Sequence, residues 1–350
     1  MGEKHMRKIT MNVEDCEPGM QIAETVFNEY GAIIVSEGTL LDNHILRKLD
    51  NLGILKIKIS DQSENEIISN SAEAFKAQYN ENIEVFKDVL HDISTGKNID
   101  LKKVNNVSDS VFVWINENRD IVSCIGQIRD VDEYTYTHSM NVSLLCMLLG
   151  KWMKMDAAKI KMMVQAGLLH DIGKSRIPPE ILNKPGTLSN EEFEEIKKHP
   201  VYGYRILEKM PEISKEICMG VLMHHEREDG SGYPTGARGE QINEIAKIIA
   251  VADIYDAMTS NRVYRERESP FEVFEKMENK TFGLLDPKVI NAFLNNIASY
   301  YIGDIVKLNT GEIGEIVYIN PRHVSQPLVK VGNKYLDLTL ERGVRINELI

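Results

Sequence analysis

The residues in this sequence best suited to chemistry are a histidine and an aspartate side by side, His170-Asp171, within the apolar run LLHDIGK. Lys174 follows one helical turn later. A histidine and a carboxylate buried next to each other cost free energy unless a partner compensates them. Because imidazole nitrogen and carboxylate oxygen both bind divalent metal ions, the pair predicts a metal site at the end of a buried helix.

Other metal-seeking side chains lie at or near the ends of apolar segments in the middle of the chain. With the first pair they form a set of five histidines and two aspartates: His138, His170, Asp171, His199, His224, His225 and Asp253. One such histidine alone is more often an ordinary core residue, but a core has little reason to bury the whole set. Imidazole and carboxylate without nearby thiolate suit iron, manganese or zinc, and argue against a structural zinc site.

The size of this set predicts two metal ions, because one ion with about four to six positions cannot accept every donor and still bind water. Adjacent helical residues point roughly 100° apart, so His170 can bind one ion while Asp171 bridges both. The pair His224-His225 would serve the second ion with His199. Two-metal sites typically hydrolyse phosphate esters, because the ions activate a shared water and clamp the attacking and leaving oxygens.

Phosphate hydrolysis also needs cations where negative charge develops on the phosphate oxygens. The candidates are Lys174 and two arginines beyond the Asp253 segment, Arg262 and Arg265. Arginine is the better bidentate phosphate ligand. The alternative for all three is an ordinary exposed cation that pairs weakly with nearby acids.

A glycine-rich loop, EREDGSGYPTGARG, follows the two adjacent histidines. Such a loop can bring its backbone and the aromatic face of Tyr233 close to a ligand. The alternative for Tyr233-Pro234 is a simple turn.

The elements that must position these side chains divide the chain into four parts. Residues 1–60 read as a small β-rich domain with a helix at 42–51 and a strand at 54–59, and 61–120 as a helical connecting region. Residues 121–300 are helical and hold the site. Residues 301–350 show hairpins around Thr310-Gly311 and Gly332-Asn333, which predict a small β-barrel-like unit. The fold class is therefore mainly α with small β-rich terminal units.

One helix has a clear start signal in the sequence. Ser189 followed by Glu192 is a capping box, which predicts that a helix begins there and runs through EEFEEIKKH. Pro200 is expected to end that segment.

Composition excludes several partners. The net charge of −12 over 350 residues gives no general attraction to nucleic-acid polymers or anionic membranes. The four cysteines are widely separated, which fits a reducing cytoplasm rather than a disulfide framework. No signal-peptide pattern is visible, and the longest apolar run, VSLLCMLLG, is too short to cross a bilayer. These features predict a cytoplasmic protein.

Three motifs occur together between residues 120 and 290: HD followed by GK, then HHEREDGSGYP, then ADIYDAMTSNRVYR. In this combination the chain resembles the HD-GYP family of the HD phosphohydrolase superfamily. The resemblance implies an all-α bundle at 121–300 around two or three metal ions, often iron or manganese. It implies a phosphodiesterase that hydrolyses cyclic di-GMP to linear pGpG, in many members onward to GMP, with a hydroxide bridging the metals.

The resemblance also implies roles for particular residues. The seven donors named above match the family's metal ligands, with Asp171 and Lys174 also catalytic. Lys174, Arg262 and Arg265 match positions that hold substrate phosphates. Gly232, Tyr233 and Pro234 match the namesake motif, which shapes the substrate loop and is linked to protein partners. Asp256 matches an aspartate that supports the site from behind, and family analogy suggests a homodimer.

One position departs from the family pattern. Members with a third metal carry a glutamate one helical turn before the first helical histidine, and here that position is Tyr134. Two metals are therefore expected, which weakens the case for the full reaction to GMP.

Three functions remain open from the sequence. The first is an active cyclic di-GMP phosphodiesterase, favoured because every ligand position and Lys174 are filled. The second is a sensor or interaction module that binds cyclic di-GMP without cleaving it. The third keeps the chemistry but changes the substrate, to cyclic GMP-AMP or to a nucleotide handled by other HD phosphohydrolases. The Gly-Tyr-Pro loop and the two arginines favour a cyclic dinucleotide over a mononucleotide but do not separate cyclic GMP-AMP from cyclic di-GMP.

Overall fold

The computed structural model describes residues 8–27, 33–60, 70–97, 99–117, 134–260, 268–279 and 284–350. The chain folds into two compact units. The first comprises Met1–Gln78, Glu117–Gly126 and Ile297–Ile350, and the second comprises Tyr79–Asn116 and Gln127–Asn296. The four-part division expected from the sequence stays a prediction, and its limit at residue 120 lies outside the described residues.

The N-terminal part of the first unit holds two short β-ladders and one helix. Strand β1 (Lys8–Asn12) pairs antiparallel with β4 (Lys56–Ser60), and β2 (Val26–Phe27) with β3 (Ile33–Val35). A short 3-10 turn, η1 (Val13–Asp15), follows β1. Helix α1 (Asn43–Asn51) begins at Asp42, whose carboxylate accepts a hydrogen bond from the backbone N–H of Ile45. The predicted helix at 42–51 and strand at 54–59 are confirmed to within two residues.

The C-terminal part of the first unit is a five-stranded antiparallel sheet in the order β8-β7-β6-β5-β9. Its strands are β5 (Ile305–Leu308), β6 (Ile313–Asn320), β7 (His323–Val331), β8 (Lys334–Asp337) and β9 (Ile346–Leu349). The hairpins predicted around 310–311 and 332–333 are confirmed as the β5–β6 and β7–β8 connections. Strands β8 and β9 are the edges of this sheet among the strands that the structure describes.

These two parts of the first unit contact each other although more than half of the chain separates them. His44 Nε2 lies 3.1 Å from Asp304 Oδ1, and Lys48 Nζ donates to the carbonyl oxygen of Tyr300 at 3.5 Å. The aliphatic stem of Lys48 covers Gly303, where a Cβ would overlap it. The two terminal segments therefore form one body.

A buried carboxylate in this unit gives a stability prediction. Glu315 on β6 is only 8% exposed, and burial raises its pKa in spite of the nearby Lys330 and Lys48. A raised pKa means that the folded state binds the Glu315 proton more tightly than the unfolded state. Its contribution to stability is present at low pH and is lost as the pH rises through the folded-state pKa. Glu315→Gln should therefore raise the melting temperature near neutral pH, and this gain should vanish near about pH 4.

Thermal unfolding followed by circular dichroism at both pH values checks this expectation. The control is Glu312→Gln, the same change at an exposed position near the start of β6. An unchanged or lower melting temperature for Glu315→Gln near neutral pH would show that the burial penalty is not the dominant effect.

The second unit is helical, and its elements are best given in chain order. They are α2 (Asn70–Ser94, which begins in the first unit), α3 (Leu101–Glu117), α5 (Tyr134–Trp152), α6 (Ala157–Leu169), η2 (Ile172–Arg176), α7 (Pro179–Leu182), α8 (Asn190–Ile196), α9 (His199–Leu207), α10 (Lys215–Met223), η3 (Gly239–Gln241), α11 (Glu244–Thr259), α12 (Pro270–Asn279) and α13 (Pro287–Ile297). The 3-10 turn η4 (Ala298–Tyr301) then leads into the C-terminal sheet. The predicted fold class, mainly α with small β units, is confirmed.

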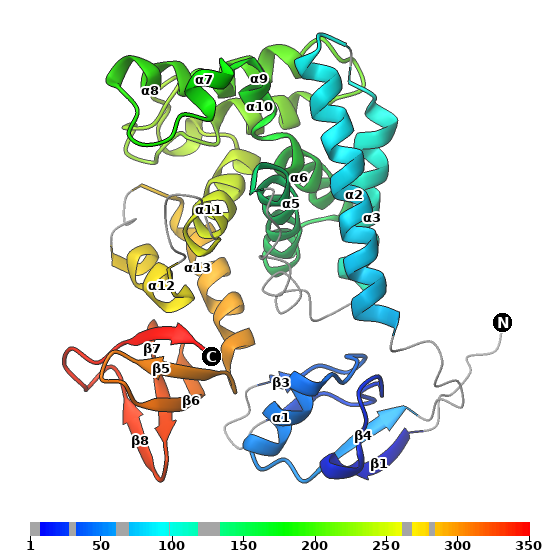
Figure 1. Ribbon diagram of the computed structural model, residues 1–350, viewed down its shortest axis with the longest axis vertical. Coiled ribbons are helices and arrows are strands. Elements are labelled where there is room, and N and C mark those ends of the chain that lie inside the picture. The colour runs from blue at the N-terminus through cyan, green and yellow to red at the C-terminus, as the bar shows by residue number, and fades with distance from the viewer. Residues whose placement is uncertain are drawn as a thin grey trace, which may run out of the picture. The chain divides into compact units, whose positions relative to one another are not determined.

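Helix α5 is the centre of this unit. Every residue from Thr137 to Gly150 is buried, because the helix is apolar on all of its faces and must be covered on all of them. Helices α6 and α11 pack against it, and α10 packs in turn against α6, α9 and α11 (Figure 1). This packing brings the ends of α6, α9 and α10 close to α5 and α11.

The capping box is confirmed, but the end predicted for its helix is wrong. The Ser189 hydroxyl accepts from the N–H of Glu192 at 3.2 Å, and the Glu192 carboxylate accepts from the N–H of Ser189 at 2.7 Å. Helix α8 already ends at Ile196, and Pro200 lies in the first turn of the next helix, α9. Proline is well tolerated there, because the N–H groups of the first turn have no partner within the helix.

Within the described residues, no helix combines the length and the hydrophobicity needed to cross a membrane.

Candidate metal centre

The seven predicted donors all lie in the second unit, on five different elements. His138 is in α5 and Asp253 in α11, while His199 begins α9. The remaining four form two adjacent pairs, at the end of α6 and at the end of α10: His170, Asp171, His224 and His225. Helix ends are where a buried helix can present polar groups without interrupting its packed sides, which explains the His-Asp pair at the end of an apolar run.

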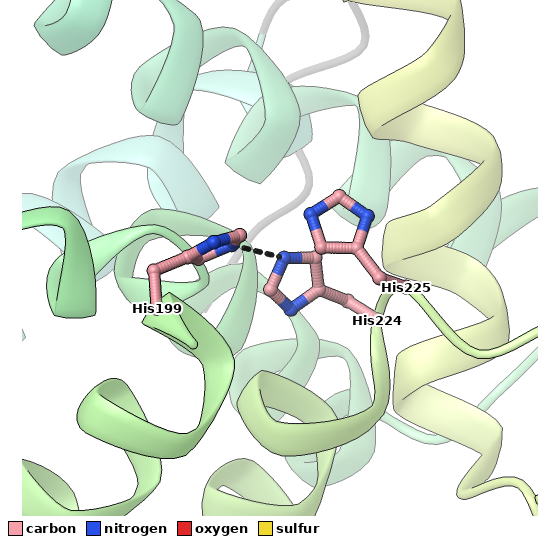
Figure 2. Close-up of side chains that lie close together, drawn as sticks. All are labelled: His199, His224 and His225. Atoms are coloured by element: carbon pink, nitrogen blue, oxygen red, sulfur yellow. Dashed lines mark hydrogen bonds between the residues drawn. The ribbon is translucent and has the colours of Figure 1, made fainter. Parts of the chain in front are cut away.

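The donor atoms gather into two groups. His199, His224 and His225 form one group, and His138, His170 and Asp171 form the other; within each group the ligand atoms lie within 4.8 Å of one another. Figure 2 shows the first group, with the rings of His224 and His225 directed toward His199 from the end of α10. Asp253 adjoins the second group, since its Oδ1 is 3.1 Å from His138 Nε2.

Asp171 lies between the two groups. Its Oδ2 is 3.2 Å from His170 Nε2 and 3.8 Å from His138 Nε2, whereas its Oδ1 is 3.3 Å from His199 Nε2. The two oxygens of one carboxylate thus face different groups of histidines. This is the placement that a bridging ligand requires.

The orientation of three histidines is set by the backbone. Nδ1 of His170, His199 and His224 lies 2.7–2.8 Å from the carbonyl oxygen three residues earlier in the chain. A carbonyl oxygen only accepts hydrogen bonds, so each Nδ1 carries the proton and donates it. In the neutral ring each Nε2 is then left with its lone pair, which is the form that binds a metal ion.

A close contact between two of these nitrogens indicates a cation. His199 Nε2 and His224 Nε2 lie 3.3 Å apart (Figure 2). Burial lowers the pKa of His199 to about 4 and that of His224 well below its ordinary value, so both rings are neutral near neutral pH. Two lone pairs facing each other at this distance repel, and a cation between them would remove the repulsion.

Other charges at the site favour a cation as well. Burial alone would lower the pKa of His138, but hydrogen bonds to Asp253 and Asp256 outweigh it and raise the pKa to about 9. Burial likewise opposes ionisation of Asp171, but its interactions with His170 and Lys174 hold its pKa well below the ordinary value. The carboxylates that retain a proton on His138 would equally attract a metal ion at Nε2.

These residues fit a metal centre of the predicted kind. His170 Nε2 and Asp171 Oδ1 are buried and make no hydrogen bond, which is costly unless a ligand satisfies them. The donor set is imidazole and carboxylate without thiolate, the combination typical of catalytic iron, manganese or zinc.

His138 is supported differently from the other histidines. Its Nδ1 donates to Asp256 Oδ2 at 2.7 Å, and Asp256 also accepts from Asn141 Nδ2 at 3.0 Å and Ser260 Oγ at 3.1 Å. Asp256 is fully buried. A carboxylate behind a ligating histidine fixes its tautomer and raises its basicity.

Asp256→Asn should therefore weaken metal binding by about 10–100-fold. The amide nitrogen of the variant cannot accept a hydrogen bond, so at least one of the three donors loses its acceptor. Calorimetric titration of metal-free protein with Mn²⁺ measures the change, with the exposed Asp88→Asn as control. An affinity within about twofold of wild type would contradict a supporting role for Asp256.

The Gly-Tyr-Pro loop lies against the adjacent histidines His224 and His225. The ring of Tyr233 stacks on His225 with 4.7 Å between centroids, and Gly232 packs so tightly on the backbone of 225–227 that a Cβ would overlap it. Glu226, which no sequence pattern singled out, is buried, and its Oε1 accepts from both the N–H and the hydroxyl of Thr235. The Tyr233-Pro234 peptide bond is cis.

The predicted phosphate ligands are placed only in part. Lys174 Nζ lies at the rim of the donor set, 2.5 Å from Asp171 Oδ2. Arg262 and Arg265 lie outside the described residues. Helix α5 begins at Tyr134, but the side chain of Tyr134 also lies outside what the structure describes.

Two buried polar residues near His138 were not identified from the sequence. Asn141 lies three residues after His138, a spacing that places both on one face of α5, so this signal was present. Tyr79, on α2, donates to Asn141 Oδ1 at 2.9 Å. No local pattern connects it to the site.

Comparison with known proteins finds a matching domain family and several relatives. Residues 123–289 match the HD domain family. A cyclic di-GMP phosphodiesterase of Pseudomonas aeruginosa is 35% identical over 69% of this chain and 58% of its own length. A cyclic di-GMP phosphodiesterase of Thermotoga maritima is 32% identical over 71% of this chain and 64% of its own. This chain thus spans about three fifths of the length of these relatives.

Two further comparisons extend this finding. A 3′3′-cGAMP-specific phosphodiesterase of Vibrio cholerae is 35% identical over 53% of this chain and 44% of its own length. The solved structure of an HDG"Y"P protein from Bdellovibrio bacteriovorus covers 82% of this chain and 98% of its own, with a TM-score of 0.52 and 18% identity, and supports the fold. Residues 123–289 therefore match an HD domain, and the HD domain that the motifs predict in this part of the chain is confirmed.

Proposed function

We propose that this chain is a metal-dependent phosphodiesterase that hydrolyses cyclic di-GMP to linear pGpG. The observation that carries the proposal is Asp171, whose two oxygens face two separate groups of histidines within an HD domain. Two curated relatives that share at least 32% identity with this chain are named cyclic di-GMP phosphodiesterases.

The proposed site holds two divalent ions, iron or manganese. His138, His170 and Asp253 would hold one ion, His199, His224 and His225 the other, and Asp171 would contact both. When bound, such ions activate water and stabilise the charge that develops on the phosphate. A third ion is not part of the proposal, because Tyr134 replaces the glutamate expected for it.

The chain's own side chains would bind and orient the substrate. Lys174 lies beside Asp171 and would neutralise a phosphate oxygen there, with Arg262 and Arg265 as further phosphate ligands. Tyr233, whose ring stacks on His225, would provide the aromatic surface of the loop. His170, His199 and His224 keep their protons on Nδ1 through the backbone, so they enter the reaction already in the ligating form.

A cyclic GMP-AMP phosphodiesterase is the second candidate. The curated relative that acts specifically on 3′3′-cGAMP is as similar in identity as the first cyclic di-GMP enzyme, although it covers less of the chain. The two substrates differ only in one base, so the metal centre would be the same. The alternative that is not an enzyme is a sensor that binds cyclic di-GMP without cleaving it.

The test is purification without oxygen, metal analysis, and incubation with each cyclic dinucleotide, with products separated by chromatography. Release of pGpG with about two iron or manganese ions per chain would support the proposal. GMP as final product would favour a third ion. Cleavage of cyclic GMP-AMP alone would establish the second candidate, and metal-free protein without turnover would favour the sensor.

The cytoplasmic location, the homodimer and a protein partner at the Gly-Tyr-Pro loop are kept as predictions. The terminal β segments, residues 1–60 and 301–350, are proposed to receive the regulatory signal.

A further inference from the structure

A row of buried polar side chains leads from the metal centre to a helix outside the matched HD domain. It starts at His138, whose Nδ1 donates to Asp256 at 2.7 Å. Asn141 donates to the other oxygen of Asp256 at 3.0 Å, and Tyr79 donates to Asn141 at 2.9 Å. Tyr79 belongs to α2, well before the HD domain begins at residue 123.

The chemistry of these groups fixes the direction of every hydrogen bond. A carboxylate only accepts hydrogen bonds, and Asp256 accepts them from groups on His138, Asn141 and Ser260. Asn141 must therefore turn its amide nitrogen toward Asp256, which leaves its oxygen toward Tyr79. The hydroxyl of Tyr79 must then donate. If the Tyr79 hydroxyl is removed, the oxygen of Asn141 loses its buried donor, and the position of Asn141 against Asp256 is held less firmly.

Burial makes these links consequential. Tyr79 and Asp256 are fully buried and Asn141 is 3% exposed, so bulk water cannot replace a missing partner. The Tyr79 hydroxyl also lies 3.5 Å from the carbonyl oxygen of Thr137 on α5, the residue before His138. Tyr79 thus contacts the helix that carries His138 at two points one turn apart.

We infer that Tyr79 is a positioning residue of the metal centre, supplied by α2 and acting on His138 through Asn141 and Asp256. This inference rests on the proposed metal centre. It assigns to the region before the HD domain a direct part in setting the orientation of a metal ligand. The ring of Tyr79 would fill its place equally well as phenylalanine, so the hydroxyl is the part that acts.

Tyr79→Phe should weaken Mn²⁺ binding by roughly 3–10-fold, less than the loss of a direct partner of a ligating histidine, which is typically about 10–100-fold. Calorimetric titration of the metal-free variant with Mn²⁺ measures this loss of affinity. The matched control is Tyr202→Phe on α9, which removes a 2.9 Å hydrogen bond to Glu195 on α8 and should leave Mn²⁺ affinity unchanged.

A double-mutant cycle separates this role from a general structural one. If Tyr79 acts through Asn141, Tyr79→Phe should have little further effect on Mn²⁺ affinity in an Asn141→Ala background. Additive losses, or a wild-type affinity in Tyr79→Phe, would overturn the inference.

A second readout does not depend on metal. In metal-free protein, NMR can follow the His138 Nδ1 proton and the side-chain amide of Asn141, and Tyr79→Phe should speed the exchange of both with water. Unchanged exchange would overturn the inference even if the wild-type protein proved to bind no metal. Failure of the wild-type protein to bind metal would by itself contradict only the proposed function.

Discussion

Asp171→Ala is expected to abolish hydrolysis of cyclic di-GMP and to lower the metal content of the purified protein, while the fold remains intact. The Asp171 oxygens face His170 on one side and His199 on the other, so the variant removes a group shared by both sets of histidines. Turnover should fall by more than about 10³-fold, since loss of a single preorganised donor at a reaction centre already costs about 10²–10³-fold. Metal analysis and product chromatography measure the two effects.

The control for this variant is Asp109→Ala. Asp109 is exposed on α3, where it pairs with Lys161 at 2.5 Å, and pairs of this kind contribute little. It should retain wild-type activity and metal content. Retained turnover in Asp171→Ala would show that the metal assignment is wrong, whereas loss of turnover with full metal content would point to a role in substrate handling alone.

Gly173→Ala is expected to impair both folding and activity, although it adds only one methyl group. Gly173 lies in η2 directly after the His-Asp pair, where a Cβ would overlap the carbonyl oxygen of His199 and the backbone nitrogen of Gly203. Because these are backbone atoms, α9 as a whole must move away and take His199 with it. Overpacking of this kind costs about 1–3 kcal/mol of stability. A displacement of about 1 Å at a reaction centre can cost about 10²-fold in rate.

Gly150→Ala provides the matched comparison. This glycine is also buried in a helical segment, but the nearest atoms that a Cβ there would meet belong to the side chains of Ile160 and Met163 and not to the backbone. Its activity should stay within a few-fold of wild type. Denaturant unfolding measures the stability of both variants, and activity assays measure their turnover. A fully active Gly173→Ala protein would show that the position of His199 does not depend on the close approach of Gly173 to the backbone of α9.

Several elements were predictable because their causes are local. The capping box at Ser189, the helix at 43–51 and the hairpins of the C-terminal sheet depend on residues close together in the chain. The end of α8 was predicted wrongly for a related reason. Pro200 disfavours the interior of a helix but fits the first turn of one, and the sequence does not say which case applies.

By itself, the sequence predicted the HD domain and the seven candidate donors, because polar side chains within apolar segments indicate that they need a partner. Only the tertiary structure decided how the donors group, which oxygen of Asp171 faces which histidines, and that Asn141 and Tyr79 support His138 from behind. It likewise decided that the two ends of the chain form one body. These relations depend on how α2, α5, α6 and α11 pack across long separations in sequence, and no local spacing encodes the distance between two helices.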